Sequence, residues 1–99
     1  MNLEQLRKFK PQIQSLARQY HIDPDSIRVF GSVARGDARP DSDVDLLVHT
    51  LPGCSLFDLG GMYMDCMDIL GREVNVVCDD SLKPRFAHAI QDDITPLRK

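Results

Sequence analysis

Apolar residues at the start of the chain recur every three or four positions, which is the period of one apolar face on a helix. They are Leu3, Leu6, Phe9, Ile13, Leu16, Ala17 and Tyr20. Asn2 is a residue type that caps helices, whereas Pro11 lacks the amide hydrogen that a helix interior needs. The pattern therefore predicts an amphipathic helical segment that either kinks at Pro11 or restarts with this proline in its first turn.

Three shorter segments are predicted to be strands, because their residues alternate in polarity or are rich in β-branched types. They comprise residues 26–30, 43–50 and 73–78. The middle segment divides between two faces, with Val44, Leu46 and Val48 on one and Asp43, Asp45 and Leu47 on the other. We therefore expect one apolar face and one face that carries two carboxylates.

A second helical stripe is predicted over residues 56–70, and Gly71 stands where a glycine commonly ends a helix. Residues 84–92 are predicted to form a short helix, and residues 31–42 a turn with at most one or two helical turns. This order implies a small mixed sheet flanked by helices, which is an α/β or α+β fold.

Composition limits the chain to one small domain. It has 99 residues, of which 42% are hydrophobic and 27% are charged, so we expect a single domain over residues 1–99. The sequence contains neither the roughly 20 apolar residues of a membrane-spanning helix nor a secretion leader, which predicts a cytoplasmic protein without membrane contact. Three widely spaced cysteines favour reduced, packed thiols over disulfides or a zinc site.

Charge and length also exclude classes of function. A net charge of −3 gives no overall electrostatic signal for nucleic-acid binding. The three histidines are scattered, and none lies at metal-ligand spacing from another or from a cysteine. A template-directed polymerase is disfavoured, because 99 residues leave no separate domain to hold a template or primer.

Asp43 and Asp45 carry the strongest chemical signal. On one strand face their Cα atoms would lie ~7 Å apart, and at an effective dielectric of ~20 two carboxylates ~6 Å apart repel by roughly 3 kcal/mol. Aspartate is also a poor strand former. A sequence that accepts both costs is typical of a cation site, and a site built only of oxygen ligands favours Mg²⁺.

Gly31 and Ser32 stand where a strand ends and a short helix begins. Glycine permits a close backbone approach there, and backbone amides with a serine hydroxyl can hold phosphate oxygens. Because this dipeptide precedes Asp43 by about ten residues, one loop can reach both ends of a metal–triphosphate complex. The combination predicts a nucleotide site.

Two better-known motifs do not fit the same segment. Gly31 and Gly36 have the spacing of a P-loop, but Asp37-Ala38 stand where its lysine and hydroxyl residue belong. The run from Asp41 to Asp45 begins like an EF-hand, but Leu46 occupies its glycine position.

The run of Gly31-Ser32, ten further residues and Asp43-Val44-Asp45 resembles the signature of the DNA polymerase beta-like nucleotidyltransferase superfamily. The short chain resembles its minimal nucleotidyltransferase (MNT) branch, small prokaryotic proteins often paired with a HEPN-domain partner in toxin-antitoxin modules. The resemblance implies a mixed sheet flanked by helices, a site for Mg²⁺ and ATP, and transfer of AMP to a tyrosine of the partner toxin.

The resemblance also implies roles for individual residues. Gly31 and Ser32 would grip the β- and γ-phosphates, and Asp43 and Asp45 would hold the metal and serve catalysis. Arg35 would contact phosphate or the partner.

One position departs from the family pattern. Related proteins bring a third carboxylate from the next strand after a Gly-Arg turn, and here that position is Asn75. Asparagine carries no charge and cannot take a proton from a nucleophile. Glu73, one step earlier on the same strand face, could replace it, and Asp79 and Asp80 at the strand end are further candidates.

Two functions follow from these observations. The first is a Mg²⁺-dependent adenylyltransferase that modifies a HEPN-type toxin and so acts as its antitoxin. The second is a catalytically impaired antitoxin that binds nucleotide and neutralises its partner by contact alone. The helical face around Met62, Tyr63 and Met67 would serve such contact or pack in the core, and self-association of the chain stays open.

Overall fold

The computed structural model describes residues 1–97 of the chain and has a mixed α/β architecture. The helices are α1 (Leu3–Arg7), α2 (Lys10–Gln19), α3 (Gly31–Arg35), α4 (Leu56–Leu70) and α5 (Pro84–Ile90). The strands are β1 (Arg28–Phe30), β2 (Val44–Val48), β3 (Val74–Cys78) and β4 (Thr95–Pro96), and a 3₁₀ turn spans Asp79–Ser81. The strand–helix–strand order confirms the predicted fold class.

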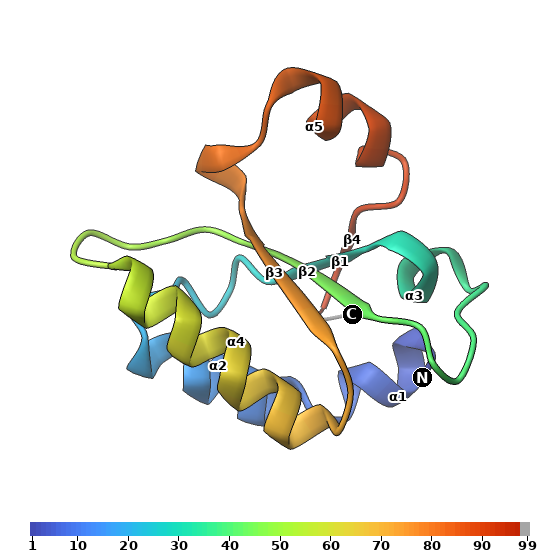
Figure 1. Cartoon of the computed structure of the whole chain (residues 1–99), viewed down its shortest axis with the longest axis horizontal. Coiled ribbons are helices and arrows are strands. Elements are labelled where there is room, and N and C mark those ends of the chain that lie inside the picture. The colour runs from blue at the N-terminus through green and yellow to red at the C-terminus, as the bar shows by residue number, and fades with distance from the viewer. Residues whose placement is uncertain (98–99) are drawn as a thin grey trace.

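The four strands form one sheet in the order β3-β2-β1-β4. β2 and β3 run parallel, whereas β1 pairs antiparallel with both β2 and β4. The long crossover between the parallel strands is α4, as parallel pairing requires. Figure 1 shows β2 and β3 crossing the middle of the molecule with helices on both sides of the sheet.

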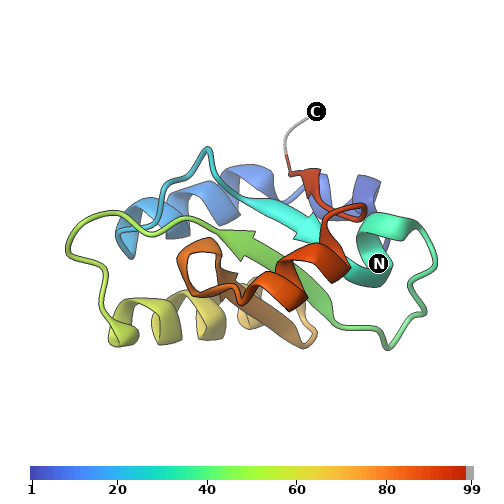
Figure 2. The same cartoon turned by 90° about the horizontal axis from the view of Figure 1, so that it is seen from above.

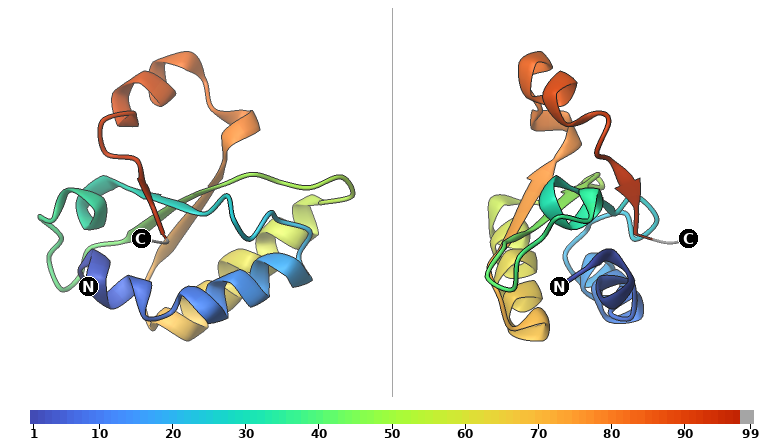
Figure 3. Two further views of the ribbon diagram at one scale, coloured as in Figure 1. Left: turned by 180° about the vertical axis from the view of Figure 1, so that it is seen from behind. Right: turned by 90° about the vertical axis from the view of Figure 1, so that its right-hand side faces the viewer.

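The helices cover the two faces of the sheet unequally. α1, α2 and α4 lie against one face and α5 lies against the other, as Figures 1 and 3 show. Val44, Leu46 and Val48 belong to the larger core under α1, α2 and α4. Leu47 lies on the opposite face in a small cluster with Phe30 and Ile90, which confirms the predicted alternation along β2.

The N-terminal segment forms two helices, which is one of the two predicted arrangements: the helix ends and a new one begins with Pro11 in its first turn. Asn2 caps α1 in a reciprocal pair of hydrogen bonds with Gln5, and Pro11 stands in the first turn of α2. A proline is tolerated there because the first amides of a helix have no intrahelical acceptor.

β4 is the one strand that the sequence did not predict. Thr95 and Pro96 pair with Val29 and Arg28, and Arg7 donates to the carbonyls of Pro96 and Leu97 from α1. Two residues, one of them proline, are too few to show alternation.

The structure also bears on the cysteines and on the expectation of no membrane-spanning helix. All three thiols are unpaired, and burial raises the pKa of Cys66 to about 12. Over residues 1–97, no helix has both the length and the apolar character needed to cross a bilayer.

Candidate functional site

The carboxylate of Asp45 lies at the centre of the sheet. Asp45 pairs with Phe30 on β1 and with Asn75 on β3, so β2 has a neighbouring strand on each side at this residue. Asn75 Nδ2 donates a hydrogen bond of 2.9 Å to Asp45 Oδ1. This contact fixes the orientation of a half-buried carboxylate without giving it a counter-charge. We call the sheet surface that bears Asp45 and Asn75 the site face.

Gly31 makes room for this carboxylate. It directly follows β1 and has a φ of +75°, a conformation that residues with a side chain rarely adopt. A Cβ atom at this position would overlap Asp45 Oδ2. The sequence predicts a close approach of phosphate at this glycine, and the group that approaches it in the structure is the Asp45 carboxylate.

Asp43 and Glu73 come together at the N-terminal ends of the two parallel strands. They directly precede the paired residues Val44 and Val74, and the Val44 amide donates to the Glu73 carbonyl at 3.0 Å. Strand alternation places both side chains on the site face, next to Asp45 and Asn75. The position expected for a third acid therefore holds an amide, but a carboxylate lies one step away and opposite Asp43.

A tyrosine from α4 contacts this acidic group. Tyr63 Oη donates to Glu73 Oε1 at 3.3 Å. The pKa of Tyr63 is raised by the charge of Glu73, then by burial, by the hydrogen bond to Glu73, and by the charge of Asp43. From the sequence alone, Tyr63 is expected only to contact a partner or to pack in the core.

Asp43, just before β2, and Asp45, within β2, are available for a cation. Within residues 1–97, neither Asp43 nor Asp45 forms a salt bridge with a lysine, arginine or histidine. Carboxylate oxygens are the donors that Mg²⁺ prefers. Because these oxygens share one face and are not neutralised internally, the residues fit a magnesium site.

An open cavity of about 610 Å³ borders the site. Its walls come from β1, β2, β3, α4 and α5: Phe30, Asp45, Tyr63, Asn75, Val76, Val77 and Phe86. Phe86 of α5 stands edge-on to Phe30, with ring centroids 5.9 Å apart. Figure 2 shows α5 lying over the sheet at this place. The cavity therefore offers apolar, partly aromatic walls beside a carboxylate, which suits a ligand with a flat ring and a charged group.

Ser32 and Arg35 lie on α3, the short helix that begins at Gly31. Ser32 is half-buried in the first turn, and its carbonyl accepts from the Gly36 amide that closes the helix. Arg35 pairs with Asp93 at 3.0 Å and with Asp37 at 3.3 Å. Both hydrogen bonds, the one to Asp93 first, raise the pKa of Arg35. The guanidinium is thus already paired within the chain.

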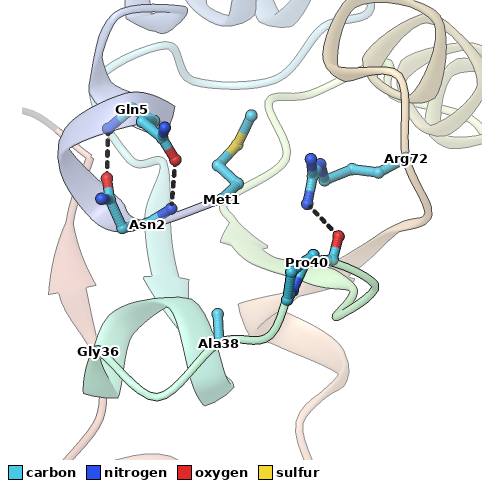
Figure 4. Close-up of a pocket in the computed structure, with 7 residues that line it drawn as sticks. All are labelled: Met1, Asn2, Gln5, Gly36, Ala38, Pro40 and Arg72. Carbon is cyan, nitrogen blue, oxygen red and sulfur yellow. Dashed lines mark hydrogen bonds between the residues drawn. The ribbon is translucent and has the colours of Figure 1, made fainter.

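The loop that leads to Asp43 is held by a residue of the turn between α4 and β3. Arg72 Nη1 donates to the Pro40 carbonyl at 3.1 Å, and the loop also closes on itself through Arg39 and Ser42. Figure 4 shows the Arg72 guanidinium pointing toward Pro40. Both residues and the start of α1 line a hollow of about 330 Å³. This role of Arg72 is not predictable from the sequence pattern, because Arg72 and Pro40 are far apart along the chain.

The alternative acids Asp79 and Asp80 lie at the opposite end of the sheet. They follow the C-terminal end of β3, whereas Asp43 precedes the N-terminal end of the parallel β2, so the idea that they supply the third acid is wrong. Asp79 instead contacts Arg28 at 2.8 Å and His49 at 2.9 Å.

These contacts shift the pKa values of Asp79 and His49. Burial alone would raise the pKa of Asp79, but the hydrogen bonds from Arg28 and His49 outweigh it and lower the pKa. The hydrogen bond to Asp79 raises the pKa of His49. Ligand atoms of His49, Asp79 and Asp80 also lie within 4.8 Å of one another, a grouping that the scattered sequence positions did not reveal.

Comparison with known proteins places this geometry in a family. Residues 11–97 match the family model described as polymerase beta, nucleotidyltransferase. A protein of Thermococcus cleftensis named protein adenylyltransferase MntA is 37% identical over 70 residues, which cover 69% of this chain and 69% of that protein.

Solved structures agree. A minimal nucleotidyltransferase is 38% identical with a TM-score of 0.81, and the match covers 97% of this chain and 96% of that one. An MNT antitoxin complex with tri-AMPylated HEPN toxin of Shewanella oneidensis, matched over 93% of this chain and 71% of that one, shares the fold at 16% identity and a TM-score of 0.67. With its family motif on the site face of a matching sheet, this chain belongs to the polymerase beta nucleotidyltransferase family, in its minimal branch.

Proposed function

We propose that this chain is a protein adenylyltransferase that transfers AMP from ATP to a tyrosine hydroxyl of a HEPN-type toxin and thereby acts as its antitoxin. The observation that carries the proposal is the pair of carboxylates of Asp43 and Asp45, which share one face where β2 begins and have no ion-pair partner among residues 1–97. The name of the Thermococcus relative and the HEPN complex among the similar folds support it.

Asp43 and Asp45 are the residues proposed to hold Mg²⁺. When bound, the ion would neutralise the charge of the triphosphate and activate the attacking hydroxyl. Gly31 and Ser32, at the start of α3, are proposed to contact the phosphates through backbone amides and the Ser32 hydroxyl. The apolar cavity beside Asp45 is proposed to receive the nucleoside, because its walls include the rings of Phe30 and Phe86.

In this proposal, two residues replace the missing third acid: Asn75 orients Asp45, and Glu73 accepts the proton. Asn75 donates to Asp45 Oδ1 and thus holds that carboxylate in one orientation. Glu73 lies opposite Asp43 and is proposed to take the proton of the attacking hydroxyl, which an amide cannot do. Arg35 would have to break its ion pair with Asp93 before it could contact phosphate. We therefore propose that Arg35 contacts the toxin, or that it only holds the chain together through Asp37 and Asp93.

One observation favours a second candidate function. Because Asn75 replaces an acid, the chain would be a slow enzyme or an antitoxin that binds nucleotide and blocks the toxin by contact alone. Both readings keep the same Mg²⁺–ATP site and the same partner. They differ in whether AMP becomes covalently attached to the toxin.

A labelling experiment separates the two functions. The purified chain is incubated with ATP labelled at the α-phosphate, Mg²⁺ and the HEPN-type protein of the same organism. We expect label on the HEPN-type protein, and we expect the Asp43→Ala, Asp45→Ala double variant to abolish it. Asp41→Ala is the matched control, because Asp41 is an exposed aspartate of the same loop outside β2. Tight binding with no label would support the contact-only antitoxin.

The same proposal places the protein in the cytoplasm, the compartment that contains ATP and keeps thiols reduced. Its three free cysteines agree with a reducing compartment.

A further inference from the structure

The hydroxyl of Tyr63 contacts the carboxylate that is proposed to accept the proton of the attacking hydroxyl. It donates to Glu73 Oε1 at 3.3 Å, and Glu73 is the carboxylate that stands opposite Asp43 at the start of the parallel strands. A nucleophilic hydroxyl must lie within hydrogen-bond reach of the group that takes its proton. Tyr63 already satisfies this condition within the chain itself.

Tyr63 also shares a cavity with the carboxylate of β2. Asp45, Asn75 and Tyr63 line the same open cavity, so no wall separates the phenol from the proposed nucleotide site. Tyr63 is only half-buried, and its ring comes from α4 at the β3 edge of the sheet. An intramolecular acceptor held in this way has a large kinetic advantage over a free one.

We propose that the chain adenylylates its own Tyr63. This inference rests on the proposed adenylyltransferase function. In the step, Tyr63 Oη attacks the α-phosphorus of ATP and forms a new oxygen–phosphorus bond. The bond from that phosphorus to the oxygen bridging to the β-phosphate breaks, and pyrophosphate leaves with the electron pair. The phenolic proton passes to the Glu73 carboxylate.

The second tyrosine of the chain provides an internal comparison. Tyr20 Oη donates to Asp65 Oδ2 at 2.5 Å, and the Tyr20 ring packs against Gly61 between α2 and α4. It belongs to the side of the sheet that α1, α2 and α4 cover, away from the site face. Tyr20 is therefore not an acceptor, and the two tyrosines differ in placement but not in chemistry.

An adduct on Tyr63 would limit the enzyme. The attached AMP would occupy the cavity that Asp45, Phe30 and Phe86 line, because the phosphodiester would begin at its wall. A modified chain would therefore bind Mg²⁺–ATP less well than the unmodified chain. The reaction is intramolecular, so the rate constant for self-labelling should not depend on protein concentration.

Mass spectrometry of the full chain tests the proposal. After incubation with Mg²⁺ and ATP, and without any partner, we expect a mass increase of one AMP that tandem fragmentation assigns to Tyr63. Tyr63→Phe and Glu73→Gln should abolish the adduct, whereas Tyr20→Phe, the matched control, should retain it. An adduct on Tyr20, or no adduct, would overturn the proposal.

Chemical protection gives a readout that requires no turnover. Tetranitromethane nitrates accessible tyrosine rings, and we expect a nonhydrolysable ATP analogue with Mg²⁺ to slow nitration of Tyr63 at least several-fold without changing that of Tyr20. Equal nitration of Tyr63 with and without the analogue would contradict its place beside the nucleotide. Labelled HEPN-type protein without a Tyr63 adduct would refute self-modification alone, and a Tyr63 adduct with an unlabelled HEPN-type protein would refute only the proposed acceptor.

Discussion

Residue 31 must be a glycine for two reasons. Its backbone is left-handed, and it lies against the carboxylate of Asp45. Gly31→Ala should destabilise the fold by about 1–3 kcal/mol through backbone strain and should also displace the carboxylate. A catalytic group displaced by about 1 Å can cost roughly a hundredfold in rate, so AMP transfer should fall by about that factor.

Gly53 is the matched control for this prediction. Its φ of +91° carries a similar strain, but nothing lies within 4 Å of its hypothetical Cβ. Gly53→Ala should therefore lose stability and keep its specific activity. Equal activity losses in both variants, measured at a temperature where both are folded, would show that the Gly31–Asp45 contact is irrelevant to transfer.

Replacing Asn75 by aspartate should lower the stability of the protein but strengthen its binding of Mg²⁺. In Asn75→Asp a carboxylate replaces the amide that donates to Asp45, so the free energy of unfolding without Mg²⁺ should fall by about 1 kcal/mol or more. Added Mg²⁺ should recover this loss, and AMP transfer should rise because a further acid is present. Thermal melts with and without Mg²⁺ measure the first effect. If Mg²⁺ does not change the melting temperature of the Asn75→Asp variant, residues 45 and 75 do not share a metal site.

The residues of the site differ in how far the sequence could predict them. Asp43, Asp45 and Gly31 were predictable, because a carboxylate pair in an apolar strand and a glycine at a strand end conflict with local propensity. Tyr63 and Arg72 were not, because their roles come from contacts with residues that only folding brings near. The same holds for His49, which meets Asp79 across two parallel strands.

At the scale of the element, α4 contains two adjacent glycines with different surroundings. The Gly60 position is open, whereas a Cβ at Gly61 would overlap the Tyr20 ring. Gly60→Ala should stabilise the protein by about 0.5–1 kcal/mol, because alanine has the higher helix propensity. Gly61→Ala should destabilise it, because α2 and α4 must move apart. Urea denaturation of the two variants measures both signs, and stabilisation by Gly61→Ala would contradict the close packing of these helices.

Elements with local stop signals were predicted closely. α4 begins after Ser55, whose reciprocal hydrogen bonds with Asp58 cap the helix, and it ends at the left-handed Gly71. β4 has no such signal, since its two residues are held by β1 and by Arg7. Local chemistry determines where a helix begins and ends, whereas a short edge strand depends on its neighbours.

At the scale of the whole molecule, the parallel pairing of β2 and β3 separates two acidic groups to opposite ends of the sheet. The group at the far end predicts a pH dependence of stability, because the hydrogen bond to Asp79 raises the pKa of His49 above its ordinary value of 6.5. A raised folded-state pKa gives stability that is complete below about pH 6.5 and is lost as the pH rises through the folded value.

The variant His49→Asn tests this dependence. Thermal melts between pH 6 and pH 9 should show a loss of stability with rising pH in the wild type, and a smaller loss in His49→Asn. Identical pH profiles would mean that the His49–Asp79 contact does not couple protonation to folding. The site at the other end of the sheet should be unaffected by this variant.

We propose that Asp43 and Asp45 together hold Mg²⁺ with a nucleoside triphosphate. Isothermal titration calorimetry with a nonhydrolysable ATP analogue measures this binding in the wild type, in the Asp43→Asn, Asp45→Asn double variant and in the Asp41→Asn control. We expect Mg²⁺-dependent binding in the wild type and the control, and its loss in the double variant. Binding that is equal in all three proteins, or absent from the wild type, would contradict it.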